Sequence, residues 1–346
     1  MKIVVIDIAA STGGALSILK DFYSYVKEHD KINEWIFLLS DRYLEETDRI
    51  KVDILPEIKK NRWKKLLFDH ITGKKVIESY HPDAVLSLQN TAIMGLKVPQ
   101  IVYVHQSIPF QDIVRFSFLK KEERSLAIYQ YLIGGVIKHS IKKCDKVIVQ
   151  TEWMKKAAAE KTGKSSSDIC VIPPAINIDV PVEEYHWSND QFFYPSSDAV
   201  YKNVRCINQA VNLLEQRGHH PEVSVTILSE KYDKIHCIGP ILREEVMQKY
   251  QKSTLVFPSY IESCPLPLKE AKKSGTLILA SDCPFSHEIL DGYENAYFFD
   301  PFKPEELSKL MEDVMSGKII KKEAEYDDDT IKRGWEQVLS VIEEIK

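Results

Sequence analysis

The sequence lacks a long hydrophobic run. It has 346 residues, and nowhere does an apolar stretch reach the roughly 18 residues that a helix needs to cross a bilayer. The first residues, MKIVVIDIAAS, are too few and too acidic for the apolar core of a signal peptide. We therefore predict a cytosolic protein. Any contact with a membrane is expected to be peripheral, on its inner face.

Closely spaced cysteines are also lacking. The six cysteines stand singly, without a C-x-x-C pair and without a histidine at metal-ligand spacing: Cys144, Cys170, Cys206, Cys237, Cys264 and Cys283. This excludes the usual sequence signature of a structural zinc site. Free thiols in a reducing compartment fit the pattern best.

The length favours two domains, because single hydrophobic cores rarely grow beyond about 250–300 residues. The net charge of −5 is divided unevenly. Residues 1–178 contain 27 Lys and Arg against 21 Asp and Glu, whereas residues 179–346 contain 19 against 30. Nucleic acid is not the expected partner, since the net charge is negative and no recognition motif is present.

Apolar runs of strand length alternate with amphipathic segments, such as residues 15–26 and 126–143. The predicted strands are KIVVIDI, WIFLL, AVLSL, QIVYV, KVIVQ and ICVI, then FFY, VSVTIL, IHCI, TLVF, TLILA and AYFF. Such alternation predicts parallel strands joined by helices. A polar, acidic linker at 179–190 separates the two series. We predict an α/β protein with two Rossmann-like doubly wound domains, residues 1–178 and 191–329, facing a central cleft.

One strand end carries an unusual stretch, FPSYIESCPLPLKEAKKSG, at residues 257–275. Pro267 suits the first turn of a helix and Gly275 its C-terminal end. Glu262 is then expected on the loop and Glu270 in the first turns of the helix. The free N–H groups at the start of such a helix favour a phosphate. Carboxylates beside a phosphate suit a ligand that also carries hydroxyls, as a nucleotide sugar does.

This stretch resembles the E-x7-E region of the retaining glycosyltransferases of family 4. Further segments resemble that family in the expected order: GGALSIL, VYVHQSIPF, VQTEWMKKAAAEKTG, VIPPAI, YKN, CIGPILREEVMQKYQKSTLVFPS, SDCPFSHEI and YFFDPFKPEEL. The resemblance covers nearly the whole chain. It implies a GT-B fold, with the acceptor bound mainly by the N-terminal domain and a nucleotide sugar by the C-terminal one. It also implies that a helix at 330–346 packs back on the first domain.

The resemblance implies roles for residues of the second domain. Glu270 would hold the ribose hydroxyls, and Glu262 would contact the transferred sugar. Lys202 would neutralise the diphosphate as it leaves. The backbone that would face the diphosphate belongs to Ser263, Cys264 and Leu266.

In the first domain the resemblance implies that His105 lies near the sugar. Gly13 and Gly14 would let the backbone approach the donor closely. One position departs from the family pattern. Members commonly carry an arginine six positions before the lysine, as a second cation on the diphosphate, and this chain has Ser196 there.

Each of these residues also has a structural alternative. Glu262 and Glu270 could be solvated charges on a loop and a helix face, and Lys202 a surface lysine. His105 could be a core histidine at the end of an apolar strand. The pair of glycines could form an ordinary turn, and it does not match the G-x-G-x-x-G dinucleotide motif.

The segment EYDDDT, residues 325–330, matches the D-x-D metal motif of the other main glycosyltransferase fold. It follows no predicted strand and precedes a helical pattern, so acids at the start of a helix explain it better. We predict no catalytic metal and no cofactor. The expected co-substrate is a nucleotide diphosphate sugar, either a UDP- or a GDP-sugar.

The segment from Lys59 to Lys75 has seven cations and one acid, interleaved with Trp63, Leu66, Leu67 and Phe68. It could be a solvated basic face. It equally suits an anionic membrane surface, where a lipid-linked acceptor would lie.

The sequence thus predicts a metal-independent, retaining glycosyltransferase. It would move a hexose-type sugar to a glycan or lipid-linked acceptor, in bacterial-type surface polysaccharide synthesis. A nucleotide-sugar epimerase of the same fold is one alternative, which would turn over without an acceptor. A non-catalytic partner subunit is another, which would bind no nucleotide sugar.

Overall fold

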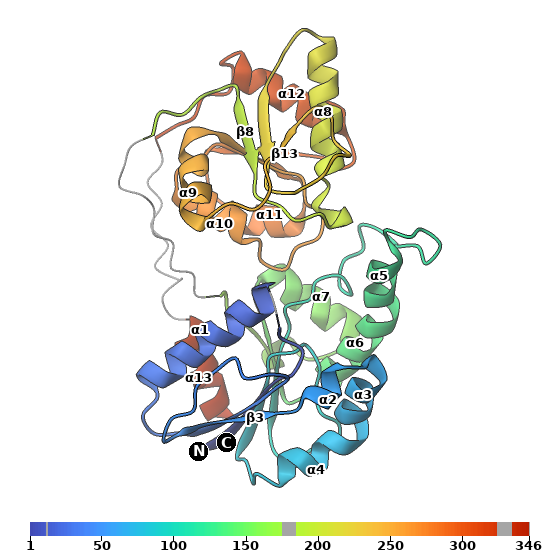
Figure 1. Cartoon of the computed structure of the whole chain (residues 1–346), viewed down its shortest axis with the longest axis vertical. Coiled ribbons are helices and arrows are strands. Elements are labelled where there is room, and N and C mark those ends of the chain that lie inside the picture. The colour runs from blue at the N-terminus through green and yellow to red at the C-terminus, as the bar shows by residue number, and fades with distance from the viewer. Residues whose placement is uncertain (12, 175–184, 324–333, 346) are drawn as a thin grey trace. The chain divides into compact units, whose positions relative to one another are not determined.

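The computed structural model describes residues 1–11, 13–174, 185–323 and 334–345. The chain divides into two compact units (Figure 1). The first unit comprises Met1–Ala175 together with Ile331–Lys346, and the second comprises Ile176–Thr330. Each unit has its own parallel sheet with helices on both faces. Within the described residues, no helix is both long enough and apolar enough to span a membrane.

The first unit has a seven-stranded parallel sheet in the order β3-β2-β1-β4-β5-β6-β7. Its strands are β1 (Lys2–Asp7), β2 (Glu34–Leu39), β3 (Ile50–Ile54), β4 (Ala84–Ser87), β5 (Gln100–Tyr103), β6 (Lys146–Val149) and β7 (Ile169–Val171). The strand order reverses between β1 and β4. In doubly wound sheets this switch point, at the carboxyl ends of the strands, is where ligands bind.

The sequence predicted six of these strands and missed β3. The prediction relied on continuous apolar runs, which are typical of parallel strands buried on both faces. β3 lies at the sheet edge, and Lys51 within it is exposed between the buried Ile50 and Val52. Buried and exposed residues therefore alternate along this edge strand, whereas the central strands are continuous apolar runs.

Helices cover both faces of this sheet. They are α1 (Gly13–His29), α2 (Pro56–Lys59), α3 (Arg62–Leu67), the π-helix η1 (Phe68–Thr72), α4 (Gly73–Glu78), α5 (Arg124–Ala127), the π-helix η2 (Ile128–Ile133), α6 (Gly134–Lys143), α7 (Glu152–Thr162) and the short 3-10 helix η3 (Ser166–Asp168). The amphipathic pattern at 126–143 thus forms α5, η2 and α6 in succession. Gly134 is required there, since a Cβ would lie 2.9 Å from the Pro109 side chain.

The C-terminal helix α13 (Gly334–Glu344) completes the core of the first unit. The Trp335 ring lies 5.1 Å from that of Phe22 in α1 and 6.1 Å from that of Tyr103 in β5, between centroids. Val338 and Ile342 are buried in the same cluster. The first unit is therefore built from both ends of the chain, which lie near each other in Figure 1.

The second unit has a six-stranded parallel sheet in the order β10-β9-β8-β11-β12-β13. Its strands are β8 (Gln191–Tyr194), β9 (Glu222–Val225), β10 (His236–Cys237), β11 (Thr254–Phe257), β12 (Ile278–Ser281) and β13 (Ala296–Phe299). Its helices are the short 3-10 helix η4 (Val200–Lys202), α8 (Val204–Gln216), α9 (Arg243–Lys252), α10 (Leu266–Lys273), α11 (Pro284–Ile289) and α12 (Pro304–Met315). The switch point lies between β8 and β11. Both sheets thus have the predicted doubly wound order.

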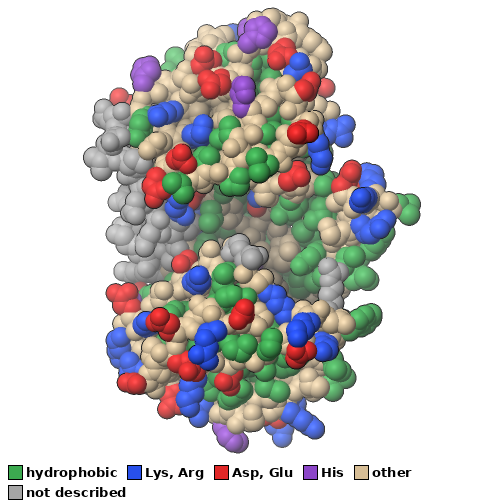
Figure 2. Space-filling view, viewed as in Figure 1, with side chains coloured by type: hydrophobic (Ala, Val, Ile, Leu, Met, Phe, Trp, Pro, Cys, Tyr) green, Lys and Arg blue, Asp and Glu red, His purple; other side chains and the backbone are tan. Residues whose placement is uncertain are grey.

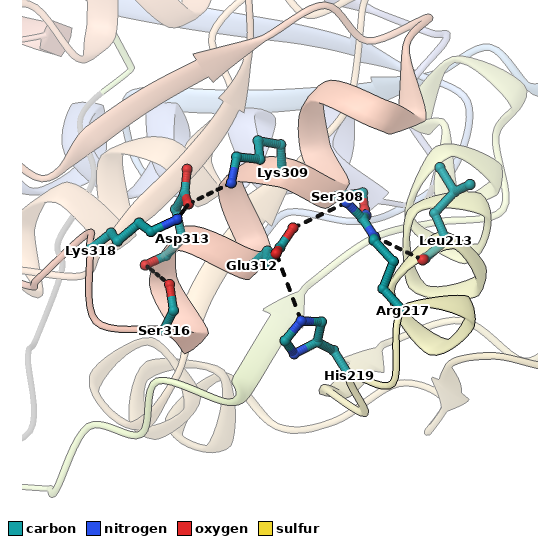
Figure 3. Close-up of polar contacts among 9 residues, drawn as sticks. All are labelled: Leu213, Arg217, His219, Ser308, Lys309, Glu312, Asp313, Ser316 and Lys318. Atoms are coloured by element: carbon teal, nitrogen blue, oxygen red, sulfur yellow. Dashed lines mark hydrogen bonds and ion pairs between the residues drawn. The ribbon is translucent and has the colours of Figure 1, made fainter.

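Polar contacts join α8 to α12 (Figure 3). Arg217 Nη1 lies 3.1 Å from Glu312 Oε2, and His219 Nε2 lies 3.8 Å from Glu312 Oε1. Arg217 also contacts the Ser308 hydroxyl. Crossover helices run antiparallel to the strands, so this end of α8 lies at the amino edge of the sheet. The Arg217–Glu312 pair is therefore remote from the strand ends where ligands bind.

Candidate active site

An ion pair connects the two loops at the switch point of the second sheet. Lys202 follows β8, at the end of η4, and Glu262 follows β11. Lys202 Nζ lies 2.5 Å from Glu262 Oε1. Ser259 Oγ donates to the same carboxylate oxygen over 2.7 Å. Lys202 and Glu262, two of the residues that the sequence assigned to the donor, are therefore in direct contact although they lie 60 positions apart.

Backbone contacts hold these loops in place. Asn203 follows η4 in the left-handed conformation, with φ 57°, which asparagine tolerates better than most residues. Its side-chain amide donates to the Pro258 carbonyl over 3.2 Å and to the Pro301 carbonyl over 2.7 Å. The N–H of Tyr260 donates to the Tyr201 carbonyl over 3.1 Å. The loops after β8, β11 and β13 are thereby fixed to one another.

The pair remains partly open to solvent, with 18% of the Lys202 side chain and 14% of the Glu262 side chain exposed. Burial lowers the pKa of Lys202, but the Glu262 carboxylate outweighs that effect, and the net shift is upward. The ammonium therefore stays charged at neutral pH. It can neutralise a phosphate that reaches the loops.

Glu270 lies in α10, as the sequence predicted. Pro267 is in the first turn of that helix, and Gly275 follows its C-terminal cap with φ 65°. Glu270 is buried; its Oε1 lies 2.9 Å from Arg243 Nη2, and its Oε2 accepts a 3.2 Å hydrogen bond from Tyr250. Burial raises the pKa of Glu270, while Arg243 and Tyr250 oppose the shift. Each carboxylate oxygen has a second lone pair, so the group can also accept from a ligand hydroxyl.

The segment between the two glutamates leads into α10. Ser263 is half-buried, Cys264 is buried, and Leu266 is the first residue of the helix. The pKa of the Cys264 thiol is raised by burial, and the positive charge of Lys269 opposes the rise. Among the second-domain residues assigned from the sequence, Lys202 and Glu262 are in contact, whereas Glu270 contacts Arg243 and Tyr250.

Sequence reasoning missed Arg243, the first residue of α9. Its position could have drawn attention to it, because the helix dipole disfavours a cation at the start of a helix. The two residues that follow it, Glu244 and Glu245, are of the favourable sign. An arginine in the unfavourable position suggests a task other than helix stabilisation.

His105 lies in the first unit, just beyond β5. Its backbone N–H donates to Asn90 Oδ1 over 2.6 Å, and its ring lies 4.2 Å from that of Tyr103, between centroids. Burial lowers the pKa of His105 to about 4, although an interaction with the Leu88 backbone opposes the shift. The imidazole is therefore neutral at pH 7, and it can donate a hydrogen bond or accept one.

Gly13 and Gly14 begin α1, close after the end of β1. A Cβ placed on Gly14 would meet no atom within 4 Å. Packing therefore does not require glycine at that position. The close approach of a ligand, which the resemblance implied, remains a prediction.

Two further polar residues lie at the switch point of the first sheet, and the sequence analysis did not single them out. Asp7 ends β1 and is buried; burial raises its pKa to about 7, although the Ala10 N–H and nearby lysines oppose the shift. Gln89 follows the neighbouring strand β4. It is buried, and neither atom of its side-chain amide has a hydrogen-bond partner in the described part of the chain. A buried amide without a hydrogen-bond partner calls for an explanation, and a bound ligand or ion is one.

The basic segment from Lys59 to Lys75 differs from a free cationic face. Lys59 Nζ donates to the Ala10 carbonyl over 3.2 Å, and Lys65 Nζ lies 2.6 Å from the buried Asp69. Lys60 and Lys64 both pair with Glu57. Several of its cations are therefore neutralised within the protein.

Apolar side chains of the same segment are exposed instead. Trp63 is 77% exposed, Leu67 48% and Ile71 65%, at four-residue intervals along α3 and η1. We refer to these three residues as the apolar stripe. The EYDDDT segment, residues 325–330, and the first half of the predicted linker, residues 179–184, lie outside the described residues.

Comparisons with known proteins agree with this fold. A family model described as Glycosyltransferase Family 4 matches residues 35–180, and one described as Glycosyl transferases group 1 matches residues 222–334. The O-antigen chain mannosyltransferase RfbU of Salmonella typhimurium is 25% identical over 201 residues, covering 54% of this chain and 54% of RfbU. The alignment thus spans about half the length of that relative.

Solved structures match the chain over nearly its full length. The lipopolysaccharide outer core galactosyltransferase WaaB has a TM-score of 0.64, with 16% identity and 99% of each chain covered. WaaG, a glycosyltransferase involved in lipopolysaccharide biosynthesis, has a TM-score of 0.67, with 14% identity and 98% of this chain and 99% of WaaG covered. HepE of Anabaena, in complex with UDP-glucose, has a TM-score of 0.62, with 14% identity and 100% of this chain and 98% of HepE covered.

At these identities the structural matches show the fold, and the two family models account for most of both units. From the models and the fold together, we conclude that the chain belongs to glycosyltransferase family 4 and has the GT-B fold.

Proposed function

We propose that the chain is a retaining, metal-independent hexosyltransferase. It takes a sugar from a nucleotide diphosphate donor and passes it to a glycan or lipid-linked acceptor, in the synthesis of a surface polysaccharide. The observation that carries this proposal is the contact between Lys202 and Glu262 at the switch point of the second sheet, beside the start of α10. A cation and helix N–H groups there suit a diphosphate, and the carboxylates suit hydroxyls.

The proposed chemistry needs no protein nucleophile. The bond between the anomeric carbon and the diphosphate oxygen breaks, and the acceptor oxygen bonds to the same carbon on the same face. The acceptor's proton passes to the departing diphosphate. The chain's own contribution is to orient the donor and to stabilise the charge that develops on the leaving group, with Lys202 and the N–H groups at the start of α10.

Relatives suggest which donors to try first. HepE has been solved with UDP-glucose, and RfbU is named a mannosyltransferase. UDP-glucose, UDP-galactose and GDP-mannose are therefore the first candidates, with ADP- and dTDP-sugars as comparisons.

A thermal-shift screen against these sugars tests the donor assignment. We expect the sugars of one nucleotide base to raise the melting temperature of the second unit, since a ligand that binds the folded state stabilises it by mass action. Glu270→Gln should weaken the shift, because its carboxylate is expected to hold the ribose. If no nucleotide sugar shifts the melting temperature, the non-catalytic alternative is favoured. Turnover of the bound sugar without acceptor would favour the epimerase.

Chelation should leave transfer intact. Lys202 and the start of α10 are proposed to perform the neutralisation that a metal ion performs in D-x-D enzymes. The measurement is the rate of sugar transfer with and without EDTA, at a fixed donor concentration. Activity that EDTA abolishes and manganese restores would show this part of the proposal to be wrong.

We also propose that the first unit contacts an anionic membrane. Two observations support this: the exposed apolar stripe, and a second exposed group in the loop before α5. Figure 2 shows Lys and Arg side chains next to hydrophobic ones on that loop, where Phe118 and Leu119 are exposed beside Lys120 and Lys121. Aromatic and aliphatic side chains flanked by cations are typical of interfacial segments.

Replacing Trp63, Leu67 and Ile71 with serine should reduce binding to phosphatidylglycerol vesicles by about 100-fold, because three partly inserted side chains contribute roughly 3 kcal/mol together. Vesicle co-sedimentation measures the change. Added salt should weaken binding too, since charge attraction is screened over about 10 Å at 0.1 M. Lys60→Gln with Lys64→Gln should have a smaller effect, because Glu57 already pairs with both.

The matched control replaces Ile32 and Leu228, exposed apolar side chains elsewhere in the chain, with serine. If the stripe variant binds vesicles as tightly as the parent, or the parent does not bind, a soluble acceptor becomes the better proposal. Lys59 and Lys65 are left unchanged, because their contacts lie inside the unit.

A further inference from the structure

The candidate donor site has fewer cations than its ligand needs. A nucleotide diphosphate sugar brings two negatively charged phosphates, and both are usually met by cations. Lys202 already faces Glu262. Ser196 stands where an arginine is common; its N–H donates to Thr226 Oγ1 over 2.8 Å and its hydroxyl to the Ser197 carbonyl over 3.0 Å. Ser196 is therefore held by neutral partners and supplies no charge.

We propose that Arg243 is the second cation on the donor diphosphate, in place of the arginine that Ser196 replaces. This inference rests on the proposed function. Arg243 Nη2 contacts Glu270, the carboxylate expected to hold the ribose, at 2.9 Å. The diphosphate is joined directly to that ribose. A guanidinium has five N–H donors in a planar fork, which is enough to contact Glu270 and to donate to a phosphate as well.

The position of Arg243 in the fold supports this role. Arg243 starts α9, and the helix that holds Glu270 is α10. Crossover helices begin at the carboxyl edge of a parallel sheet, so both helices start at the edge where Lys202 lies. The positive ends of the two helix dipoles and the charge of the guanidinium together attract an anion to this edge. With 55% of its side chain exposed, Arg243 is accessible to a ligand from solvent.

Other cations of the second unit fit less well. Lys231 Nζ lies 3.9 Å from Asp198, and both side chains are mostly exposed, as in an ordinary surface pair. Lys269 is closer to the predicted phosphate loop, since its charge acts on the Cys264 thiol and opposes the rise in the pKa of that thiol. It contacts neither of the two glutamates in any described ion pair. Lys269 is therefore the main competitor, and the experiment includes it.

Isothermal titration of the full chain with uridine, UMP and UDP tests the inference. Arg243→Gln should weaken UDP binding by about 10- to 100-fold, as expected for the loss of a charge-assisted hydrogen bond. The effect on UMP should be smaller, and uridine affinity should change less than about 2-fold. Arg243→Lys should lie between the parent and Arg243→Gln, because it keeps the charge but loses the fork of donors. If the screen selects guanine, the series is guanosine, GMP and GDP.

Arg217→Gln is the matched control, because it breaks an Arg–Glu pair of similar length in the same unit at the opposite edge of the sheet (Figure 3). It should leave all three affinities unchanged. Lys269→Gln is titrated in parallel and should have a smaller effect on UDP than Arg243→Gln. A melting curve of each variant confirms that the second unit is folded.

Three results would overturn the inference. An equal loss for uridine, UMP and UDP in Arg243→Gln would mean that Arg243 acts on the ribose through Glu270. Unchanged UDP affinity in Arg243→Gln, with a loss in Lys269→Gln, would assign the charge to Lys269. Unchanged affinity in both variants would leave Lys202 as the main cation. Failure of the parent chain to bind UDP or GDP at all would instead contradict the proposed function, and the two failures are thereby distinguished.

Discussion

Replacing Lys202 with glutamine should lower the rate of sugar transfer by about 100- to 1,000-fold, the usual effect of removing one group that stabilises a transition-state anion. The leaving diphosphate gains negative charge as its bond to the sugar breaks, and Lys202 is the proposed partner for that charge. The measurement is kcat with saturating donor and acceptor. Lys202→Arg keeps the charge and should retain more activity than the glutamine variant.

Stability needs a separate control, because Lys202 is paired with Glu262 over 2.5 Å in a mostly buried position. Breaking such a pair leaves an uncompensated carboxylate and costs up to about 3–5 kcal/mol. The double variant Lys202→Gln with Glu262→Gln removes both charges and should recover much of that stability. It should still be inactive. Substantial transfer by a stable double variant would refute the assignment of this pair to the donor site.

Asp7→Asn should raise the unfolding free energy of the first unit more at pH 8 than at pH 4. The expected difference between the two effects is roughly 4 kcal/mol, since each pKa unit corresponds to about 1.4 kcal/mol. The pKa of Asp7 is raised from 3.8 to about 7, chiefly by burial. The folded state therefore binds the proton more tightly than the unfolded state does. The unfolding free energy of the parent falls as the pH rises from about 4 to about 7, and the asparagine variant lacks that fall.

Urea unfolding at pH 4.5 and pH 8 measures the difference between the parent and the variant. Amide hydrogen exchange in β1 and β4 gives the same comparison for the first unit alone. The control is Asp41→Asn, a change at an exposed position, which should leave the pH dependence as it is in the parent. A pH dependence that is identical in the parent and Asp7→Asn would show that Asp7 is ionised in the folded protein near its ordinary pKa.

A buried carboxyl that lowers the unfolding free energy at neutral pH is expected to have a function that outweighs this cost. Asp7 ends β1 and Gln89 follows the neighbouring strand β4, at the point of the first sheet where ligands bind. The Gln89 amide has no hydrogen-bond partner among the described residues. Acceptor hydroxyls are the groups we expect there. Lower transfer by an Asp7→Asn variant that is more stable than the parent would be the combination typical of an active-site residue.

Nearby residues were sufficient to predict the loop and the helix that contain the two glutamates. Pro267 and Gly275 mark the ends of α10 through their own backbone preferences, so the positions of Glu262 and Glu270 followed from nearby residues. The contact between Lys202 and Glu262 could be expected only through the family resemblance. The two residues are distant in sequence, and no local signal links them.

Tertiary contacts explain what the sequence did not predict. The segment from Lys59 to Lys75 reads as a run of solvated charges, yet Lys59 is turned to Ala10 and Lys65 to Asp69. Lysine has a long side chain, and its direction depends on partners that a charge count does not include. Arg243 was missed for the same reason, since its partner Glu270 lies on another helix.

The contribution of α13 to the first core reverses the usual order of folding during synthesis. Domains generally fold as they leave the ribosome, the N-terminal one first. Here the residues that cover Phe22 and Tyr103, among them Trp335 and Val338, are translated only after the whole second unit. Until α13 is translated, the nascent first unit therefore exposes an apolar face. Chaperones that bind such faces are expected to bind it during that time.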